Sequence, residues 1–173
     1  IDVSTGDCRM SKIEVNEIAR RSGSSPISIP GHVIQTTQQV YTTQTNITAT
    51  SFTSTGLTTS ITPTSASSKI LVTSSLSAEV YQNGNNGYSV VFEIKRDSTQ
   101  ISKRYANAYA KEASNGYYAF PIDGAMNFLD SPNTTSSITY SVNAYITNSG
   151  SSFTIRLNNQ TGTSTLTLQE IAA

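Results

Sequence analysis

Residues that carry covalent or metal chemistry are scarce in this chain. It contains one histidine, His32, and one cysteine, Cys8. A Ser-His-Asp or Cys-His arrangement would have to use His32, which stands next to Gly31, and the chain has no G-x-S-x-G turn. Zinc needs several Cys or His ligands, and the carboxylates around Asp123 and Asp130 are too sparse for a calcium loop. The sequence therefore predicts no metal site and no cofactor, with His32 structural or exposed.

A pair of carboxylates, Glu79 and Glu93, is the other candidate for catalysis. Glycosidases place two carboxylates on either side of the bond that they hydrolyse, and these two residues fall on strands that the sequence predicts to be adjacent. The alternative is that both carboxylates face solvent opposite Lys95 or Arg96 and keep the surface soluble. We favour the second interpretation and predict that the protein is not an enzyme.

Tyrosines are the side chains most suggestive of binding, because their rings stack on sugars and present a large area with few torsions. Glu112, Asn115 and the Asn- and Gly-rich segment 83–87 are polar neighbours that could join a glycan site. The alternative is that most of these tyrosines pack in the core or between subunits. The predicted receptor-binding set is Tyr81, Tyr88, Tyr105, Tyr109, Glu112 and Asn115.

Charge and composition limit the partners. The net charge is zero and 13% of the residues are charged, so there is no basic excess to follow a phosphate backbone, and nucleic acid is a poor partner. No apolar run is long enough to span a membrane as a helix. A lone cysteine excludes an intramolecular disulfide.

The elements that must position these residues are strands. Residues 68–97 alternate apolar and polar side chains on both sides of the segment 83–87, whose Gly and Asn residues tolerate a tight reversal. This pattern predicts a β-hairpin around which the rest of the chain is organised. Similar alternation elsewhere, strongest over 138–147, predicts about eight to ten strands. Residues 104–113 could also be helical, but no apolar helical stripe supports that alternative.

The predicted fold is therefore all-β: an antiparallel β-sandwich, jelly-roll-like, with an extended N-terminal arm. Residues 1–31 are the arm and residues 32–173 the sandwich domain. Arms bury little by themselves and need another surface to lie on. Met10 could be a native start, with residues 1–9 as a leader. The predicted attachment residues of the arm are Ile13, Val15, Ile18, Arg20 and Arg21.

Some strands are apolar on both faces, which predicts a neighbouring subunit. Leu71 points opposite to Ile70 and Val72, Val91 opposite to Val90, and Tyr117 opposite to Tyr118. Strands with two apolar faces are expected where both faces are covered, and one domain of this size covers only one. We therefore predict that Leu71, Val91 and Tyr117 lie at a subunit interface.

Three stretches together resemble a known class of domain: TGLTTSITPTSASSKILV (residues 55–72), FLDSPNTTSSITYSVNAYI (128–146) and STLTLQEIAA (164–173). They resemble the C-terminal domain of tail-fibre or virion-surface proteins of bacteriophages, especially phages of aquatic bacteria. SKIEVNEIARRSGSSPISIP, at residues 11–30, resembles the arm that precedes such domains.

The resemblance implies a homotrimeric bacteriophage virion structural protein at the virion surface, in a tail fibre or on the capsid exterior. Its partners would be other virion proteins, contacted through the arm, and a host cell-surface glycan. Two functions stay open: a surface or fibre module for host attachment, and a capsid decoration or cement protein that stabilises the shell without binding a receptor.

Overall fold

The computed structural model describes residues 29–83, 87–109, 117–147 and 153–173. These residues form strands joined by turns, with one short 3-10 segment, η1 (Asn159–Thr161). The strands are β1 (Val33–Tyr41), β2 (Thr45–Ile47), β3 (Thr53–Ile61), β4 (Lys69–Ser75), β5 (Ser77–Asn83), β6 (Gly87–Arg96), β7 (Thr99–Tyr109), β8 (Tyr117–Asp123), β9 (Met126–Asp130), β10 (Ile138–Ile146), β11 (Phe153–Leu157) and β12 (Ser164–Ile171). The all-β prediction is confirmed. Residues 1–28 of the predicted arm, which include Ile13, Val15, Ile18, Arg20 and Arg21, lie outside the described residues.

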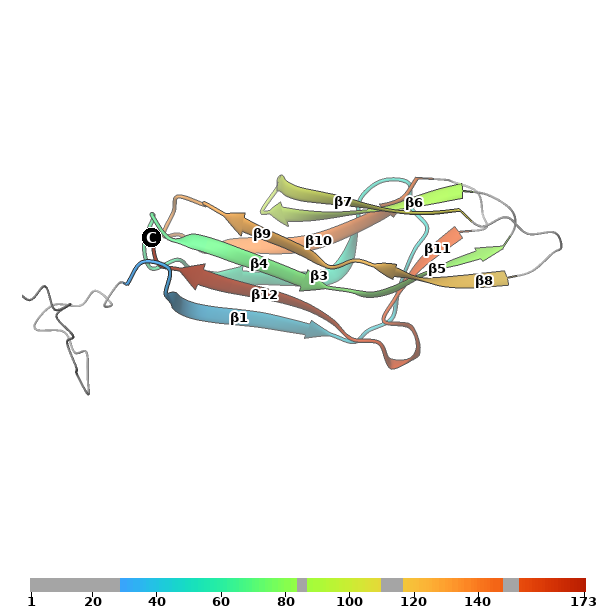
Figure 1. Cartoon of the computed structure of the whole chain (residues 1–173), viewed down its shortest axis with the longest axis horizontal. Helices are drawn as coiled ribbons and strands as arrows, with labels where there is room; N and C mark the ends of the chain where they lie inside the picture. Colours follow the sequence, from blue (N-terminus) through green and yellow to red (C-terminus); the bar gives the residue numbers. More distant parts are fainter. Residues whose placement is uncertain (1–28, 84–86, 110–116, 148–152) are drawn as a thin grey trace, which may run out of the picture.

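The strands form three antiparallel sheets, with the orders β1-β12-β4-β9, β2-β11-β5-β8 and β3-β10-β6-β7. The first two sheets repeat one order of chain segments, because only short breaks separate β1 from β2, β4 from β5, β8 from β9, and β11 from β12. They are therefore two halves of one long sheet of four interrupted strands (Figure 1). Counted in this way, eight strands form two sheets with the orders 1-8-3-6 and 2-7-4-5. This is the connectivity of a jelly roll.

The breaks in the long sheet meet one another in space. Leu76 separates β4 from β5, and Gly124 follows β8 on the neighbouring strand. A Cβ atom on Gly124 would lie 2.8 Å from both Cβ and Cδ1 of Leu76, closer than carbon atoms pack. The missing side chain at Gly124 therefore lets Leu76 fill the point where the sheet bends.

One hydrophobic core lies between the two layers. Ile47, Ile70, Phe92 and Leu168 are buried members of the same cluster and come from all three sheets. On β10 the burial alternates strictly, with every second residue from Ile138 to Ile146 buried. The period-two pattern of the sequence thus marks the inward faces correctly.

The predicted hairpin over residues 68–97 is wrong. β5 pairs with β11 and β8, whereas β6 pairs with β10 and β7, so the two strands belong to different layers. The hairpin that does form joins β6 to β7, where Arg96 pairs with Thr99 across Asp97 and Ser98. Asp97 has φ 50°, the left-handed conformation that a two-residue hairpin turn requires and that Asp tolerates. β10 and β11, which follow each other along the chain, likewise lie in different sheets.

β7 resolves the alternative left open for residues 104–113. It is a strand from Thr99 to Tyr109, paired along its length with β6. Residues 110–113 lie outside the described residues. Cross-strand hydrogen bonds and burial against β6 therefore override the good helix propensity of the Ala-rich sequence.

The first prediction concerns the loss of stability when a side chain is added at Gly56. It adopts φ +90° on β3, and a Cβ atom there would land on the ring of Tyr41. Gly56→Ala should lower the free energy of unfolding by about 2 kcal/mol or more, because it adds both backbone strain and a steric clash. Urea denaturation of Gly56→Ala, Tyr41→Leu and the double variant separates the two causes. Removing the Tyr41 ring should relieve the clash but not the backbone strain, so Gly56→Ala should cost less in the Tyr41→Leu background. If the losses of the two single variants add up fully in the double variant, the steric explanation is contradicted.

Glu170 carries the second prediction, a dependence of stability on pH. Its carboxylate is buried at the end of β12 and accepts hydrogen bonds from Gln35 Nε2 at 2.6 Å, and from Thr64 N and Oγ1 at 2.8 Å each. Burial raises the pKa of Glu170, but the hydrogen bonds from Gln35 and Thr64 outweigh it and lower the pKa below its ordinary value of 4.5. A depressed pKa contributes stability that is present above the unfolded value and is lost as the pH falls through the folded value.

Urea midpoints measured at decreasing pH should therefore show stability falling below the ordinary pKa of glutamate. Glu170→Gln should be less stable at neutral pH, because its amide replaces a charged acceptor that three donors surround. The gap between the native protein and Glu170→Gln should narrow as the pH falls. A gap that stays constant across the acid range would contradict the assignment.

Candidate ligand-binding site

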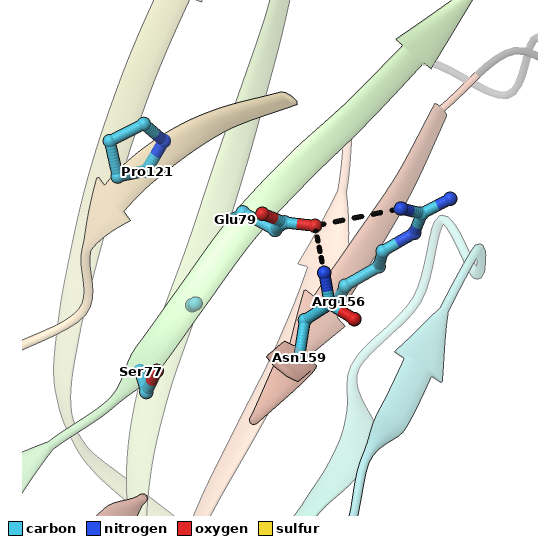
Figure 2. A pocket seen from close by; sticks show the side chains of 6 residues that line it. Ser77, Glu79, Pro121, Arg156 and Asn159 are labelled. Atoms are coloured by element: carbon cyan, nitrogen blue, oxygen red, sulfur yellow. Dashed lines mark hydrogen bonds and ion pairs between the residues drawn. The ribbon is translucent and has the colours of Figure 1, made fainter. Parts of the chain in front are cut away.

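A pocket of about 190 Å³ opens on the outer face of the β2-β11-β5-β8 sheet. The sheet register builds it, because Pro121 of β8 and Arg156 of β11 both pair with Glu79 of β5. Their side chains therefore form one row across three strands, with Glu79 in the middle (Figure 2). The pocket is lined by Ser77, Ala78, Glu79, Pro121, Arg156 and Asn159.

Hydrogen bonding fixes the Glu79 carboxylate. Asn159 Nδ2 donates to Glu79 Oε1 at 2.8 Å, and Arg156 Nη1 lies 3.6 Å from the same oxygen (Figure 2). The Glu79 and Arg156 side chains keep 24% and 28% of their exposure, so both remain accessible to a ligand. Within the described part of the chain, no group is placed at hydrogen-bonding distance from the second oxygen, Oε2.

Tyr81 also contacts Arg156. The guanidinium carbon of Arg156 lies 3.5 Å from the centre of the Tyr81 ring, which is a stacked cation-π contact. Tyr81 and Glu79 are two residues apart on β5 and therefore share its outer face. Arg156 thus contacts both a carboxylate and an aromatic ring, which reduces the freedom of its long side chain.

The loop that presents Asn159 has an unusual backbone. Asn158, Gln160 and Thr161 adopt φ values of 54°, 50° and 69°, in the left-handed region that non-glycine residues rarely enter. The surrounding structure holds this conformation through Asn158, which is buried. Asn158 Nδ2 donates to Thr43 O at 3.1 Å and Asn158 Oδ1 accepts from Ser164 Oγ at 2.7 Å. Strained backbone of this kind clusters at functional sites.

A second surface feature lies on the outer face of the opposite layer. Phe52, Tyr145, Val91 and Tyr105 form a row across β10, β6 and β7 and the residue before β3. The Phe52 and Tyr145 rings make an edge-to-face contact at 4.7 Å, and Lys103 Nζ lies 4.9 Å from the Tyr105 ring centre and 5.8 Å from that of Phe52. A hydrogen bond between Lys103 and Tyr105 raises the pKa of Lys103 and lowers that of Tyr105.

The row explains a correction at Val91, which the sequence predicts at a subunit interface. Val91 is fully buried within the chain yet is not part of the central core. Its cross-strand neighbours on either side are Tyr145 and Tyr105, and these bulky side chains cover it. A fully buried side chain has no surface left for a partner, so the interface prediction for Val91 is wrong.

Leu71 remains available for a partner. It is half-buried on the outer face of the β1-β12-β4-β9 sheet, beside Leu129, which keeps 50% of its exposure. Within the described residues, Lys69 is the one charged side chain on this outer face. We call this surface the uncharged face; it consists of Thr36, Gln38, Val40, Lys69, Leu71, Thr73, Ser75, Asn127, Leu129, Thr165, Thr167, Gln169 and Ile171.

The predicted receptor-binding residues do not form one cluster. Tyr81 lies beside the pocket, whereas Tyr105, which keeps 54% of its exposure, belongs to the opposite layer. Tyr88 and Tyr109 lie in β6 and β7, and Tyr117, the third predicted interface residue, lies in β8, but their side chains are outside the description. Glu112 and Asn115 lie outside the described residues.

Sequence reasoning missed Ser77, Pro121, Arg156 and Asn159 as site residues. Arg156 carried a signal, because it is the one charged residue on a strand whose alternate positions are Phe153, Ile155 and Leu157. The remaining residues gave none, since they meet only through pairing between distant strands. The suggested approach of Glu79 and Glu93 is wrong, because β5 and β6 lie in different sheets.

Histidine and metal chemistry were the other possibilities weighed from the sequence. His32 is exposed, just before β1. In the described ranges, no three His, Cys, Asp or Glu side chains gather as a metal site would require. A search of the same residues for a helix long and apolar enough to cross a membrane finds none.

Comparisons with known proteins add little. No protein-family model matches the chain, and no curated protein matches it. Among solved structures, it is similar to the VP2 subviral particle of infectious bursal disease virus, at 11% identity and a TM-score of 0.31 over 82% of this chain and 38% of that one. The Gt strain of that virus and its T13 viral particle give 13% identity and the same TM-score, over 82% and 79% of this chain. The chain spans less than two fifths of the length of these structures.

Proposed function

We propose that this chain is a bacteriophage virion structural protein that assembles as a homotrimer at the virion surface and attaches to a host cell-surface glycan. The observation that carries the proposal is the uncharged face. Leu71, Leu129 and Val40 are apolar there, and Val40 and Leu129 keep 58% and 50% of their exposure. Exposed apolar groups on a face with a single charged side chain, here Lys69, are typical of surfaces that another protein covers.

Two further arguments support the proposal. The quoted stretches at residues 55–72, 128–146 and 164–173 resemble phage tail-fibre or virion-surface domains. The jelly roll is a fold of viral capsid and lectin domains, although a shared fold by itself is only an analogy for function. Residues 1–31 would contact other virion proteins as an arm, in a tail fibre or on the capsid exterior.

The pocket and the aromatic row favour attachment over a purely structural role. The aromatic row lies on the opposite layer from the uncharged face, and the pocket lies on the other half of the long sheet that carries this face. A trimer formed through the β1-β12-β4-β9 half would leave both accessible. A capsid decoration or cement protein would need no such polar hollow. It remains the second candidate, because an uncharged assembly face suits both functions.

The test combines location with adhesion. Antibodies raised against the purified chain should label the tail or the outer capsid of the phage that encodes it, in electron micrographs. The purified chain, labelled with a fluorescent dye, should bind cells of the host and compete with adsorption of the phage. Virions that are labelled while the cells stay unbound would favour the decoration role, and unlabelled virions would contradict the proposal.

A further inference from the structure

The geometry points to the pocket between β5, β8 and β11 as a binding site for one neutral sugar unit, with Glu79, Arg156 and Asn159 bonded to its hydroxyls. This inference rests on the proposed function, since it names the ligand class and the residues of the attachment surface. The argument uses the charge, the hydrogen-bonding groups, the size and the backbone of the pocket.

Charge excludes simple ions as the ligand. Arg156 Nη1 lies 3.6 Å from Glu79 Oε1, so the one cation and the one anion that line the pocket neutralise each other. An anion would meet the carboxylate, and a cation would meet the guanidinium. A neutral ligand avoids both repulsions and needs no counter-charge.

Hydrogen-bonding capacity matches a polyol. Both contacts to Glu79 end on Oε1 (Figure 2), which leaves Oε2 as an acceptor. Asn159 uses one amide hydrogen on Glu79 and keeps its carbonyl oxygen, while the forked guanidinium of Arg156 carries five N–H donors. Adjacent sugar hydroxyls each donate and accept, so one can give its proton to Glu79 while the next accepts from Arg156.

The pocket also offers apolar surface and a suitable size. Pro121 lies on β8, on the side of Glu79 away from Arg156 (Figure 2). The C–H face of a sugar ring can pack on the proline ring while its hydroxyls face Glu79. The volume of about 190 Å³ is smaller than the roughly 300 Å³ at which drug-sized pockets begin, which fits a single sugar unit.

The backbone beside the pocket provides an independent argument. Gln160 and Thr161 flank Asn159 on its C-terminal side with φ values of 50° and 69°, and such residues cost about 1–3 kcal/mol each. Asn158 is locked by Thr43 and Ser164, so the loop is held in this shape before any ligand arrives. The rigid loop holds the Asn159 amide in place at Glu79, which reduces the conformational entropy lost when a ligand binds.

The experiment follows the side-chain amide signal of Asn159 by nuclear magnetic resonance on the full chain. The probes are methyl α-glucopyranoside, methyl β-galactopyranoside and N-acetylglucosamine, with sodium sulfate as the anion control. We expect at least one sugar to shift the Asn159 signal in a saturable manner, and sulfate to leave it unchanged. Glu79→Gln keeps the shape of the side chain and should weaken the binding of that sugar at least about tenfold, a loss of about 1.4 kcal/mol in binding free energy.

Glu93→Gln is the matched control. Asn143 Nδ2 donates to Glu93 Oε1 at 2.9 Å on the opposite layer. This variant therefore makes the same change in another hydrogen-bonded Glu–Asn pair, away from the pocket. It should leave sugar affinity unchanged. Asn159→Ala is a second pocket variant, which loses the amide without changing a charge and should also weaken binding. Because it removes the reporting signal, its affinity is measured by isothermal titration calorimetry beside the native protein. Melting temperatures identify any variant whose fold is lost.

Three outcomes would overturn the inference: no sugar shifts Asn159, sulfate shifts it equally, or Glu93→Gln weakens binding as much as Glu79→Gln does. The proposed function fails separately. If antibodies against the protein label virions and the protein adheres to cells, while Glu79→Gln adheres equally well, the attachment function stands and the pocket is excluded as the attachment site. If the sugar binds at Asn159 but no virion carries the protein, the pocket stands and the virion role fails.

Discussion

A Leu71→Asp variant is expected to be a folded monomer under conditions in which the native protein has a mass near three chains of 18.5 kDa. Leu71 lies within the uncharged face, between Leu129 of β9 and Gln169 of β12. A carboxylate buried there without a partner would cost several kcal/mol in each contact between subunits. In the isolated chain the same carboxylate stays partly exposed, so the fold is retained.

Light scattering coupled to size exclusion, at micromolar concentration, measures the mass, and far-ultraviolet circular dichroism checks that the β structure is kept. Gln100→Asp is the control, because Gln100 is exposed on β7 in the opposite layer. It should remain a trimer. A native protein that is a stable monomer would contradict the assembly proposal, and a trimeric Leu71→Asp would move the interface away from the uncharged face.

Replacing Asp130 with alanine is expected to lower the free energy of unfolding by about 3 kcal/mol. Both oxygens of the buried Asp130 carboxylate accept from Arg96 Nη1 at 2.9 Å, and Oδ2 also accepts from the Tyr140 hydroxyl at 2.7 Å. Asp130 lies on β9 in one layer, and its two partners lie on β6 and β10 in the other. The cluster therefore joins the two sheets through the core.

The loss in Asp130→Ala has two parts. The Tyr140 side chain is fully buried and would keep a hydroxyl without its acceptor, which costs about 1–3 kcal/mol. Arg96 keeps 27% of its side-chain exposure, so water partly compensates its lost partner. Burial, and then the hydrogen bond to Asp130, raise the pKa of Tyr140, so the hydroxyl remains the donor over the whole range in which the protein is handled.

Urea denaturation at neutral pH measures this effect. Tyr140→Phe is the matched control, because it removes one hydrogen bond and leaves the Arg96–Asp130 pair intact. It should cost about 1 kcal/mol, clearly less than Asp130→Ala. Equal losses in the two variants would show that the Arg96–Asp130 pair adds nothing to the Tyr140 hydrogen bond. An Asp130→Ala variant as stable as the native protein would show that the cluster does not stabilise the fold.

The sequence alone determined the class of fold and the inward faces of the strands. Alternation such as Ile138, Tyr140, Val142, Ala144 and Ile146 places every second side chain on one face, whatever strand lies beside it. The two-sided apolar pattern also identified Leu71 correctly as an outward-facing residue. These conclusions needed only the geometry of a single strand.

The tertiary structure decided which strands are neighbours, and with that the candidate site. Alternation says which face of β5 is buried but not whether β6 or β11 pairs with it, because hydrogen bonds between strands carry no local sequence signal. Residues 68–97 therefore read as a hairpin, although β5 and β6 lie in different layers. Arg156 and Asn159 reach Glu79 only through the pairing of β11 with β5. Val91 is buried only because β10 and β7 bring tyrosines to both of its sides.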